Sequence, residues 1–231
     1  MPHHLWLCLT CLAIATYFVY VEHKERYVYA DIIKGIASCC FVVLGYLGAK
    51  SYGWPQGTGI EGQAKVILIG LCIGAVADVV LNLRYVFEGR QAQISFLVGI
   101  LVFLAGHVAY IVALSGYFAS ILPAFLIGAV VAWLLLRWVF SQIDAPKAFK
   151  IFGVFYIGVI SIMNVMAIMA LFAMPSARTL VFMVGALFFL ASDLILIINN
   201  FGPEQRFSLR IANLMLYYVA QLLIAISIQL V

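Results

Sequence analysis

Long, nearly uninterrupted apolar runs constrain this chain more than any other feature of its sequence. A helix that crosses the hydrocarbon core of a bilayer needs about 20 apolar residues. Backbone groups in lipid must be bonded within their own segment, so continuous runs predict helices, whereas strands of a membrane barrel alternate apolar and polar residues. We therefore predict an all-α, polytopic membrane protein with eight transmembrane helices in one domain, residues 1–231. The predicted helices are 3–21, 31–50, 65–83, 94–115, 118–139, 151–173, 179–200 and 210–231.

The composition excludes the main soluble classes. The chain is 66% hydrophobic and 10% charged, against about 45–50% apolar and about 25% charged residues in an ordinary soluble domain. The net charge of +4 is spread thinly and no basic run occurs, so we expect no nucleic-acid partner.

The ends and connections of the predicted helices carry most of the charge. The first apolar run ends at Glu22-His23-Lys24 and lacks a small-residue cleavage site, so it is interpreted as a helix and not as a signal peptide. The segment 51–64, rich in glycine, is the longest predicted loop. The connection at Gly116-Tyr117 is so short that it predicts an antiparallel pair of the fourth and fifth helices.

The distribution of Lys and Arg predicts the orientation in the membrane. Ten of these residues lie in or beside the first, third, fifth and seventh loops, and three lie beside the second and sixth. Because cytoplasmic loops carry the excess of positive charge, the odd loops are predicted to be cytoplasmic and both termini to face outward. The ten are Lys24, Arg26, Lys34, Arg84, Arg90, Arg137, Lys147, Lys150, Arg206 and Arg210, and the three are Lys50, Lys65 and Arg178.

Ionisable groups within membrane spans are candidates for function, because each costs several kcal/mol unless it is paired or hydrated. Asp78, His107 and Asp193 lie deepest in their predicted helices. Lys34 and Arg137 lie nearer helix ends, where long cationic side chains can snorkel to the membrane surface.

Other polar residues share faces with these groups. Gly70, Gly74, Asp78 and Asn82 are spaced four apart, so they lie on one helix face, and the glycines let a neighbouring helix approach. The further candidates for the bundle interior are Tyr110, Tyr156, Asn164, Ser192, Asn213, Tyr217, Tyr218 and Gln221. A purely structural interhelical hydrogen bond is the favoured interpretation for the amide side chains of Asn82, Asn164, Asn213 and Gln221. For the two aspartates function is favoured, because a carboxylate is harder to bury than an amide.

A faint internal repeat relates the two aspartates. The segment 66–70 precedes Asp78 by the same spacing that the segment 181–185 precedes Asp193. Each aspartate then lies on the third helix of a four-helix half. An even number of helices makes such halves parallel, so both carboxylates would lie at the same depth and face each other across the bundle.

The cysteines give no sign of a metal centre. All five lie in apolar spans, and Cys8 and Cys11 form the one C-x-x-C pair. Without a second pair or a hydrophilic setting, buried free thiols are expected and no metal site is predicted. No G-x-S-x-G or H-E-x-x-H motif occurs, which disfavours serine and zinc hydrolases.

In order and helix placement, these residues resemble the YhhN-type membrane proteins, the lysoplasmalogenase family. The resemblance runs from about residue 30 to the C-terminus. The matching signals are Asp78, Gly106-His107 with Tyr110, Tyr156, Gly185 with Ser192-Asp193, and Tyr217-Tyr218 with Gln221. The chain departs from the family at Lys34-Gly35, where Lys-Pro is common, and at Ala77, where glycine is common.

The resemblance implies an eight-helix membrane hydrolase of a bacterial inner membrane or the endoplasmic reticulum. Its substrate would be a lysoplasmalogen, either lysoplasmenylethanolamine or lysoplasmenylcholine. Cleavage of the sn-1 vinyl ether would release a fatty aldehyde and a glycerophospho-alcohol. The resemblance implies no metal and no organic cofactor, and its only expected partners are the lipid substrate and membrane lipids.

The two aspartates suit this chemistry independently of the resemblance. A vinyl ether is hydrolysed by protonation of its terminal alkene carbon, and water then attacks the resulting oxocarbenium ion. One carboxylic acid and one carboxylate divide a similar task in glycoside hydrolysis. Burial of two neighbouring carboxyl groups favours one neutral and one charged group. We take Asp193 as the acid and Asp78 as the base, an assignment that the residues leave open.

The remaining candidates would bind the substrate. Tyr110, Tyr218, His107, Ser192 and Gln221 would orient the water or bind the ether and glycerol oxygens, and Lys34 and Arg84 would hold the phosphate. The full substrate-binding set is Lys34, Asn82, His107, Tyr110, Tyr156, Asn164, Ser192, Tyr217, Tyr218 and Gln221.

A proton-coupled transporter or channel is the main alternative. Intramembrane Asp and His residues and a four-plus-four repeat suit it as well. Against it, Pro123 and Pro175 lie near predicted helix ends and break no span. Bond cleavage distinguishes a hydrolase, and flux into vesicles distinguishes a transporter.

Overall fold

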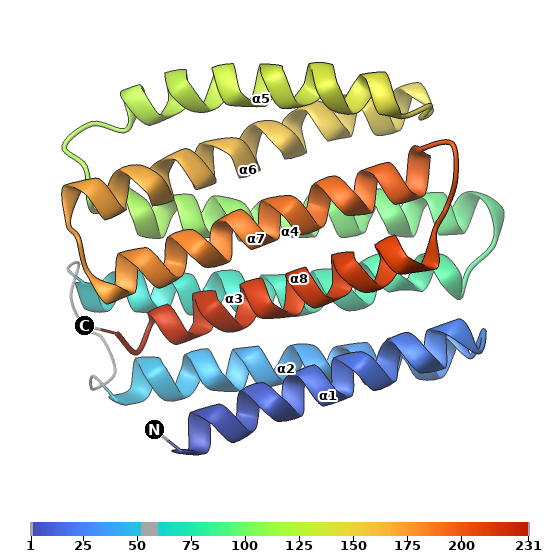
Figure 1. Ribbon diagram of the computed structural model, residues 1–231, viewed down its shortest axis with the longest axis horizontal. Helices are drawn as coiled ribbons and strands as arrows, with labels where there is room; N and C mark the ends of the chain where they lie inside the picture. The colour runs from blue at the N-terminus through green and yellow to red at the C-terminus, as the bar shows by residue number, and fades with distance from the viewer. Residues whose placement is uncertain (1, 52–59, 231) are drawn as a thin grey trace.

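The computed structural model describes residues 2–51 and 60–230, and within them it contains helices and no strand (Figure 1). The prediction of eight long helices is confirmed. Each of them is long and apolar enough to span a membrane. Their bounds are α1 Pro2–His23, α2 Tyr27–Ser51, α3 Ile60–Asn82, α4 Gly89–Ser115, α5 Leu122–Gln142, α6 Lys147–Ala173, α7 Ala177–Phe201 and α8 Phe207–Ser227.

Several helix ends differ from the predicted ones. The α2 helix begins at Tyr27, four residues before the predicted start at 31. The α5 helix begins only at Leu122, with a proline in its first turn, a position that proline favours because its missing N–H has no intrahelical partner there. Residues 52–59 of the predicted loop 51–64 lie outside the described residues, while α3 already begins at Ile60.

The helices pack in an order that corrects one prediction. The α5 helix packs on α6 and to a lesser extent on α7, and it makes no contact with α4. The expected α4–α5 pair is therefore wrong. The connection runs over 116–121, longer than predicted, and α6 lies between the two helices, packing on both (Figure 1).

The two four-helix halves share most of their packing order. Consecutive helices contact one another within α1–α4 and within α5–α8. Across the halves α2 packs on α8, and α6 packs on α4 in the corresponding relation. The outermost helices differ, since α1 also packs on α8 whereas α5 packs on α7. The contacts that the two halves share are those expected of two parallel repeats, and common ancestry of the halves stays a prediction.

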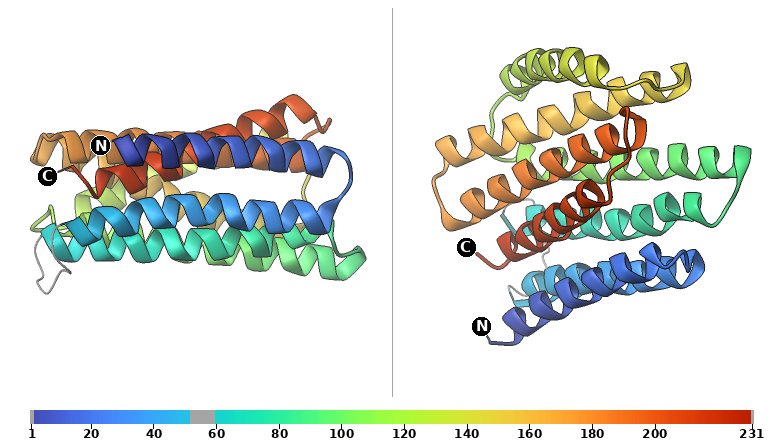
Figure 2. Two further views of the ribbon diagram at one scale, coloured as in Figure 1. Left: turned by 90° about the horizontal axis from the view of Figure 1, so that it is seen from below. Right: turned by 45° about the vertical axis from the view of Figure 1, so that its right-hand side comes forward.

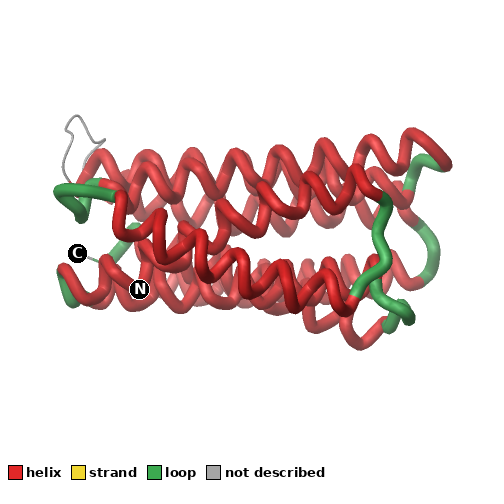
Figure 3. Tube along the Cα trace, turned by 90° about the horizontal axis from the view of Figure 1, so that it is seen from above, coloured by secondary structure: helices red, strands yellow, loops and turns green. Residues whose placement is uncertain are grey.

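The connections that follow the odd-numbered helices all lie at one end of the bundle. The α1–α2, α3–α4, α5–α6 and α7–α8 connections lie at the right of Figure 1, and both chain termini lie at the left. The additional views in Figures 2 and 3 show the same separation. We call the end that carries these four connections the odd-loop end.

The outer surface of the bundle is apolar. Exposed large hydrophobic side chains occur on all eight helices, from Trp6 on α1 to Ile211 on α8. In water such a surface would be an aggregation liability, whereas in a bilayer it faces lipid. The fold is that of a multi-pass integral membrane protein, with its polar groups turned inward.

Candidate active site

Asp78 lies in the interior of the bundle, surrounded by donors from two other helices. The hydroxyl groups of Ser38 on α2 and Tyr217 on α8 each donate to Asp78 Oδ2 at 2.6 Å. Lys34 Nζ lies 3.2 Å from Asp78 Oδ1. Both charged side chains are buried, with 3% of Lys34 and 1% of Asp78 exposed. Three donors, one of them a cation, suit a carboxylate in its charged form.

A chain of hydrogen bonds extends from this carboxylate toward α4. Tyr110 OH donates to Gln221 Oε1 at 3.1 Å, and Gln221 Nε2 donates to Tyr217 OH at 3.1 Å. Two glycines of α3 make room for it. A Cβ atom at Gly74 would lie 2.7 Å from Gln221 Nε2, and one at Gly70 would collide with the Tyr110 ring. The predicted polar face of α3 therefore carries both the carboxylate and the space that its partners need.

Asp193 on α7 has a different environment. Among the described residues, Tyr156 OH is its one hydrogen-bond donor, at 2.7 Å from Oδ2, and no Lys or Arg pairs with it. His107 Nε2 lies 3.9 Å from the same oxygen. His107 Nδ1 lies 2.7 Å from the carbonyl oxygen of Phe103, and since a carbonyl only accepts, Nδ1 carries a proton.

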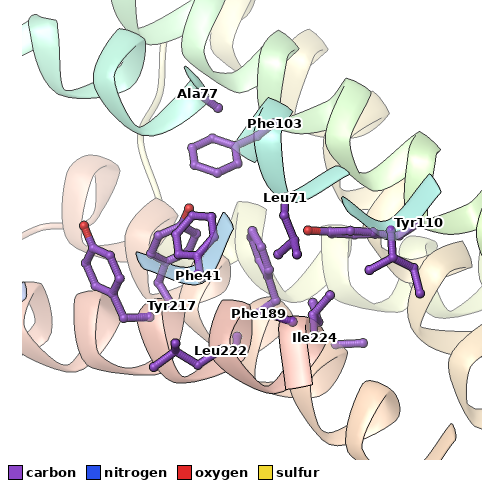
Figure 4. Packing of buried hydrophobic residues seen from close by; sticks show 14 of the residues in the cluster. Phe41, Leu71, Ala77, Phe103, Tyr110, Phe189, Tyr217, Leu222 and Ile224 are labelled. Atoms are coloured by element: carbon purple, nitrogen blue, oxygen red, sulfur yellow. The ribbon is translucent and has the colours of Figure 1, made fainter. Parts of the chain in front are cut away.

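The aromatic rings of Phe103, Phe189 and Tyr217 pack edge-on against one another in the core of the bundle (Figure 4). The Phe189 centroid lies 5.3 Å from that of Tyr217, which binds Asp78, and 4.7 Å from that of His107, which faces Asp193. These edge-on contacts fix the rings in place. The aromatic cluster therefore contacts a neighbour of each aspartate, Tyr217 beside Asp78 and His107 beside Asp193.

One cavity reaches both carboxylates. Its lining includes Asp78 of α3 and Asp193 of α7, and its volume of about 20 Å³ is enough for a water molecule. We call it the polar cavity, because its walls also carry the polar side chains of Lys34, Ser192, Arg210, Asn213 and Tyr217. Both aspartates thus line one small cavity, and their facing each other at the same depth stays a prediction.

The odd-loop end of the site is basic. Arg210 on the polar cavity wall binds Glu22 of α1 through Nε and Nη2, both at 2.8 Å. Arg84 lies over the Tyr85 ring, 4.7 Å from its centroid. The Nε and Nη1 groups of Arg84 have no hydrogen-bond partner within the part of the chain that the structure describes. The site therefore has one guanidinium group that is held by a carboxylate and one that retains free donors.

Most of the other predicted site residues bind each other or the partners of the two carboxylates, and Asn164 is the exception. Ser192 and Asn213 bind each other, with Asn213 Nδ2 at 2.8 Å from Ser192 Oγ. Asn82 accepts from Arg210 at 3.4 Å. Tyr218 OH donates to the backbone carbonyl of Lys34 at 3.4 Å.

Asn164 does not line the polar cavity, and among the described residues its one hydrogen bond is to the carbonyl of Ile160, one turn back on its own helix, at 2.9 Å.

Two features differ from the sequence-based interpretation. Lys34 does not snorkel, because α2 begins seven residues earlier at Tyr27 and the side chain turns inward to Asp78. Ser38 and the Glu22–Arg210 pair were not among the predicted site residues. Ser38 is one turn from Lys34 on the same helix, which is the signal that could have found it.

No metal site is evident in the described ranges. They contain no group of three or more His, Cys, Asp or Glu side chains that could hold a metal ion. The five cysteines are free thiols. The Cys11 thiol donates to the Ala37 carbonyl at 3.3 Å.

Comparison with known proteins gives one match. The model of the YhhN family matches residues 29–228, which cover α2 to α8 and every residue of the site except Glu22. Searches of curated proteins and of solved structures found no match.

Proposed function

Because the chain belongs to the YhhN family, we propose that it is a membrane-embedded ether hydrolase that cleaves the vinyl ether bond of lysoplasmalogens. One observation carries the proposal: Asp78 and Asp193 line the same cavity while their partners differ. Asp78 has a cation and two hydroxyl donors, whereas Asp193 has a single hydroxyl donor. Two carboxyl groups whose surroundings favour opposite protonation states are the usual acid and base of such a reaction.

The surroundings of Asp193 support its role as the acid. In a neutral His107 ring with its proton on Nδ1, Nε2 is an acceptor, and it faces the Asp193 carboxyl group 3.9 Å away. A neutral acceptor nitrogen beside a carboxyl group favours the uncharged form of that group, because a carboxylate would be repelled by the nitrogen lone pair. We assign a proton to Asp193, from which it is available for transfer to the substrate.

The proposed reaction consumes one water. Asp193 donates its proton to the alkene carbon farther from the ether oxygen, which leaves an oxocarbenium ion stabilised by the Asp78 carboxylate. Water adds to the carbon beside the oxygen and gives its proton to Asp78. The hemiacetal then breaks its bond to the glycerol oxygen, which takes the proton from Asp78, while the hemiacetal hydroxyl gives its proton to Asp193 and becomes the aldehyde carbonyl. The products are a fatty aldehyde and a glycerophospho-alcohol, and both aspartates are back in their starting forms.

The basic odd-loop end supports a phosphate-bearing substrate. Arg84 offers two guanidinium nitrogens without partners among the described residues, and guanidinium groups bind phosphate oxygens strongly. Lys34, the other residue proposed for this task from the sequence, is already bound to Asp78. In the proposal Lys34 therefore positions the base, and Arg84 holds the head group.

Aldehyde release by the purified protein from lysoplasmenylethanolamine and lysoplasmenylcholine tests the proposal. Asp78→Asn and Asp193→Asn should each lower turnover by at least 100-fold, the lower range for the loss of an acid or a base. Asp193→Asn should keep an unfolding temperature close to that of the parent. Asp78→Asn leaves Lys34 unpaired and should unfold at a lower temperature, so turnover is compared at a temperature at which every form is folded. Asn164→Ala, outside the site, is the matched control and should retain activity. Release that survives both aspartate substitutions would refute the assigned site. Flux of substrate into vesicles without any cleavage would favour the transporter instead.

A further inference from the structure

A second cavity adjoins the polar one and is almost entirely apolar. It is lined by residues of α3 to α7 and leaves about 40 Å³ accessible to the centre of a water-sized molecule. Its walls include the rings of Phe96, Phe149 and Phe201. Among the described residues that line it, Tyr156 and Asp193 alone carry polar side chains. We call it the apolar cavity.

The two cavities meet at the proposed acid. Phe103, Leu196 and Asp193 lie on the walls of both. A ligand that occupies both spaces would therefore place its polar part beside Asp78 and Arg210 and its apolar part among the phenylalanine rings. The bond between the two parts would lie beside Asp193. A single-chain ether lipid has this division, because its vinyl ether joins a polar glycerol to an apolar chain.

The apolar cavity also reaches the lipid-facing surface. Phe140 of α5 lines it, yet 37% of this residue is exposed. In a bilayer an exposed side chain on α5 faces hydrocarbon. A chain of a membrane lipid could enter from this side without crossing water, since the outer wall is a single peripheral helix that packs chiefly on α6.

We propose that the apolar cavity is the binding site of the alkenyl chain and that its wall at Gly153 limits the length of chain that is accepted. This inference rests on the proposed function for the identity of the lipid. A Cβ atom built at Gly153 meets nothing within 4 Å, and Gly153 lines the cavity. A larger side chain at this position would occupy space that the alkenyl chain needs.

The structure supplies a matched control on the same helix. Gly158 of α6 likewise has nothing within 4 Å of a built Cβ atom, but it is not on the wall of the apolar cavity. Both glycines lie inside a long helix, where replacement by a larger residue improves helix propensity. Gly153→Phe and Gly158→Phe should therefore both fold, and they should differ only in what they do to the cavity.

The test compares the parent and both variants on lysoplasmenylcholines whose alkenyl chains are shortened stepwise. Each methylene group that loses its burial weakens binding about fourfold. Gly153→Phe should therefore lose at least tenfold in kcat/KM for the longest chains and little for the shortest, while Gly158→Phe keeps the parent profile. An unchanged profile in Gly153→Phe would overturn the chain-binding site.

A binding measurement separates this inference from the proposed function. A saturated-ether lysolipid, which has no vinyl ether to cleave, should raise the unfolding temperature of the parent and of Gly158→Phe, because a ligand stabilises the state that it binds. Gly153→Phe should show a smaller shift with the long-chain lipid. If no form releases aldehyde but this difference persists, the hydrolase is refuted and the chain site stands; equal shifts in all three forms would refute the chain site.

Discussion

At the scale of single residues, the Lys34–Asp78 pair is the most consequential contact in the molecule. Both groups are buried, and their charged atoms lie 3.2 Å apart. Taking two charges out of water is expensive, and removal of one partner leaves the other uncompensated. The pair therefore links the stability of the bundle to the charge of the proposed base.

Lys34→Met should destabilise the protein by about 3–5 kcal/mol, the range for breaking a buried pair by removing one partner. The double variant Lys34→Met/Asp78→Asn should recover most of this loss, because no unpaired charge remains. Thermal unfolding in detergent measures all forms, with Arg137→Met as the control, since Arg137 is exposed on α5. A double variant that is as unstable as the sum of the single variants would show that the pair is not coupled.

The same residue shows where inference from the sequence stops. Asp78, His107 and Asp193 were selected correctly as interior groups, because an ionisable side chain within a span has few other places to go. The depth of Lys34 depended on a helix start that was misplaced by four residues, from Tyr27 to 31. Four residues of helix are about 6 Å, enough to move a cation from the membrane surface into the core.

At the scale of helices, close approach between α3 and its neighbours sets the geometry of the site. Gly70 and Gly74 leave the space that Tyr110 and Gln221 fill. The four-residue spacing from Gly70 to Asn82 predicted this face of α3. It could not predict which helix would occupy the space, because partner choice depends on the shapes of all eight helices together. The wrong α4–α5 pair has the same cause: loop length limits how far apart two helices lie, yet a third helix can still pack between them.

Gly74→Ala should lower turnover about tenfold while leaving the fold intact. The added methyl group displaces the Gln221 amide, the far end of a flexible side chain, and so breaks its hydrogen bonds to Tyr110 and Tyr217. Alanine itself favours the helix over glycine by about 1 kcal/mol. Aldehyde release and the unfolding temperature are the two measurements.

Gly158→Ala is the control for this substitution, since nothing lies within 4 Å of its built Cβ atom. Gln221→Ala should reproduce the loss, and combining it with Gly74→Ala should add little, because both changes remove the same interactions. Additive losses would mean that Gly74 acts through some contact other than Gln221.

At the scale of the whole molecule, charge and site are concentrated at the same end. Of the 13 Lys and Arg residues, ten belong to the helix ends and connections of the odd-loop end. The polar cavity lies toward that end too, between the first turns of α2 and α8 and the last turns of α3 and α7. A lipid head group therefore reaches Arg84 from the leaflet on the side where most of the positive charge lies.

Because the positive charge of a membrane protein collects on its cytoplasmic side, the odd-loop end should face the cytoplasm. Single cysteines introduced at Glu204 and Ser120, both exposed and at opposite ends, test this in a chain whose five native cysteines are replaced by alanine. A membrane-impermeant maleimide should label Ser120→Cys in intact cells and Glu204→Cys only after the cytoplasmic face is opened. The reverse pattern would place both termini inside and open the site to the outer leaflet, so that lysolipids supplied from outside would reach it without crossing the membrane.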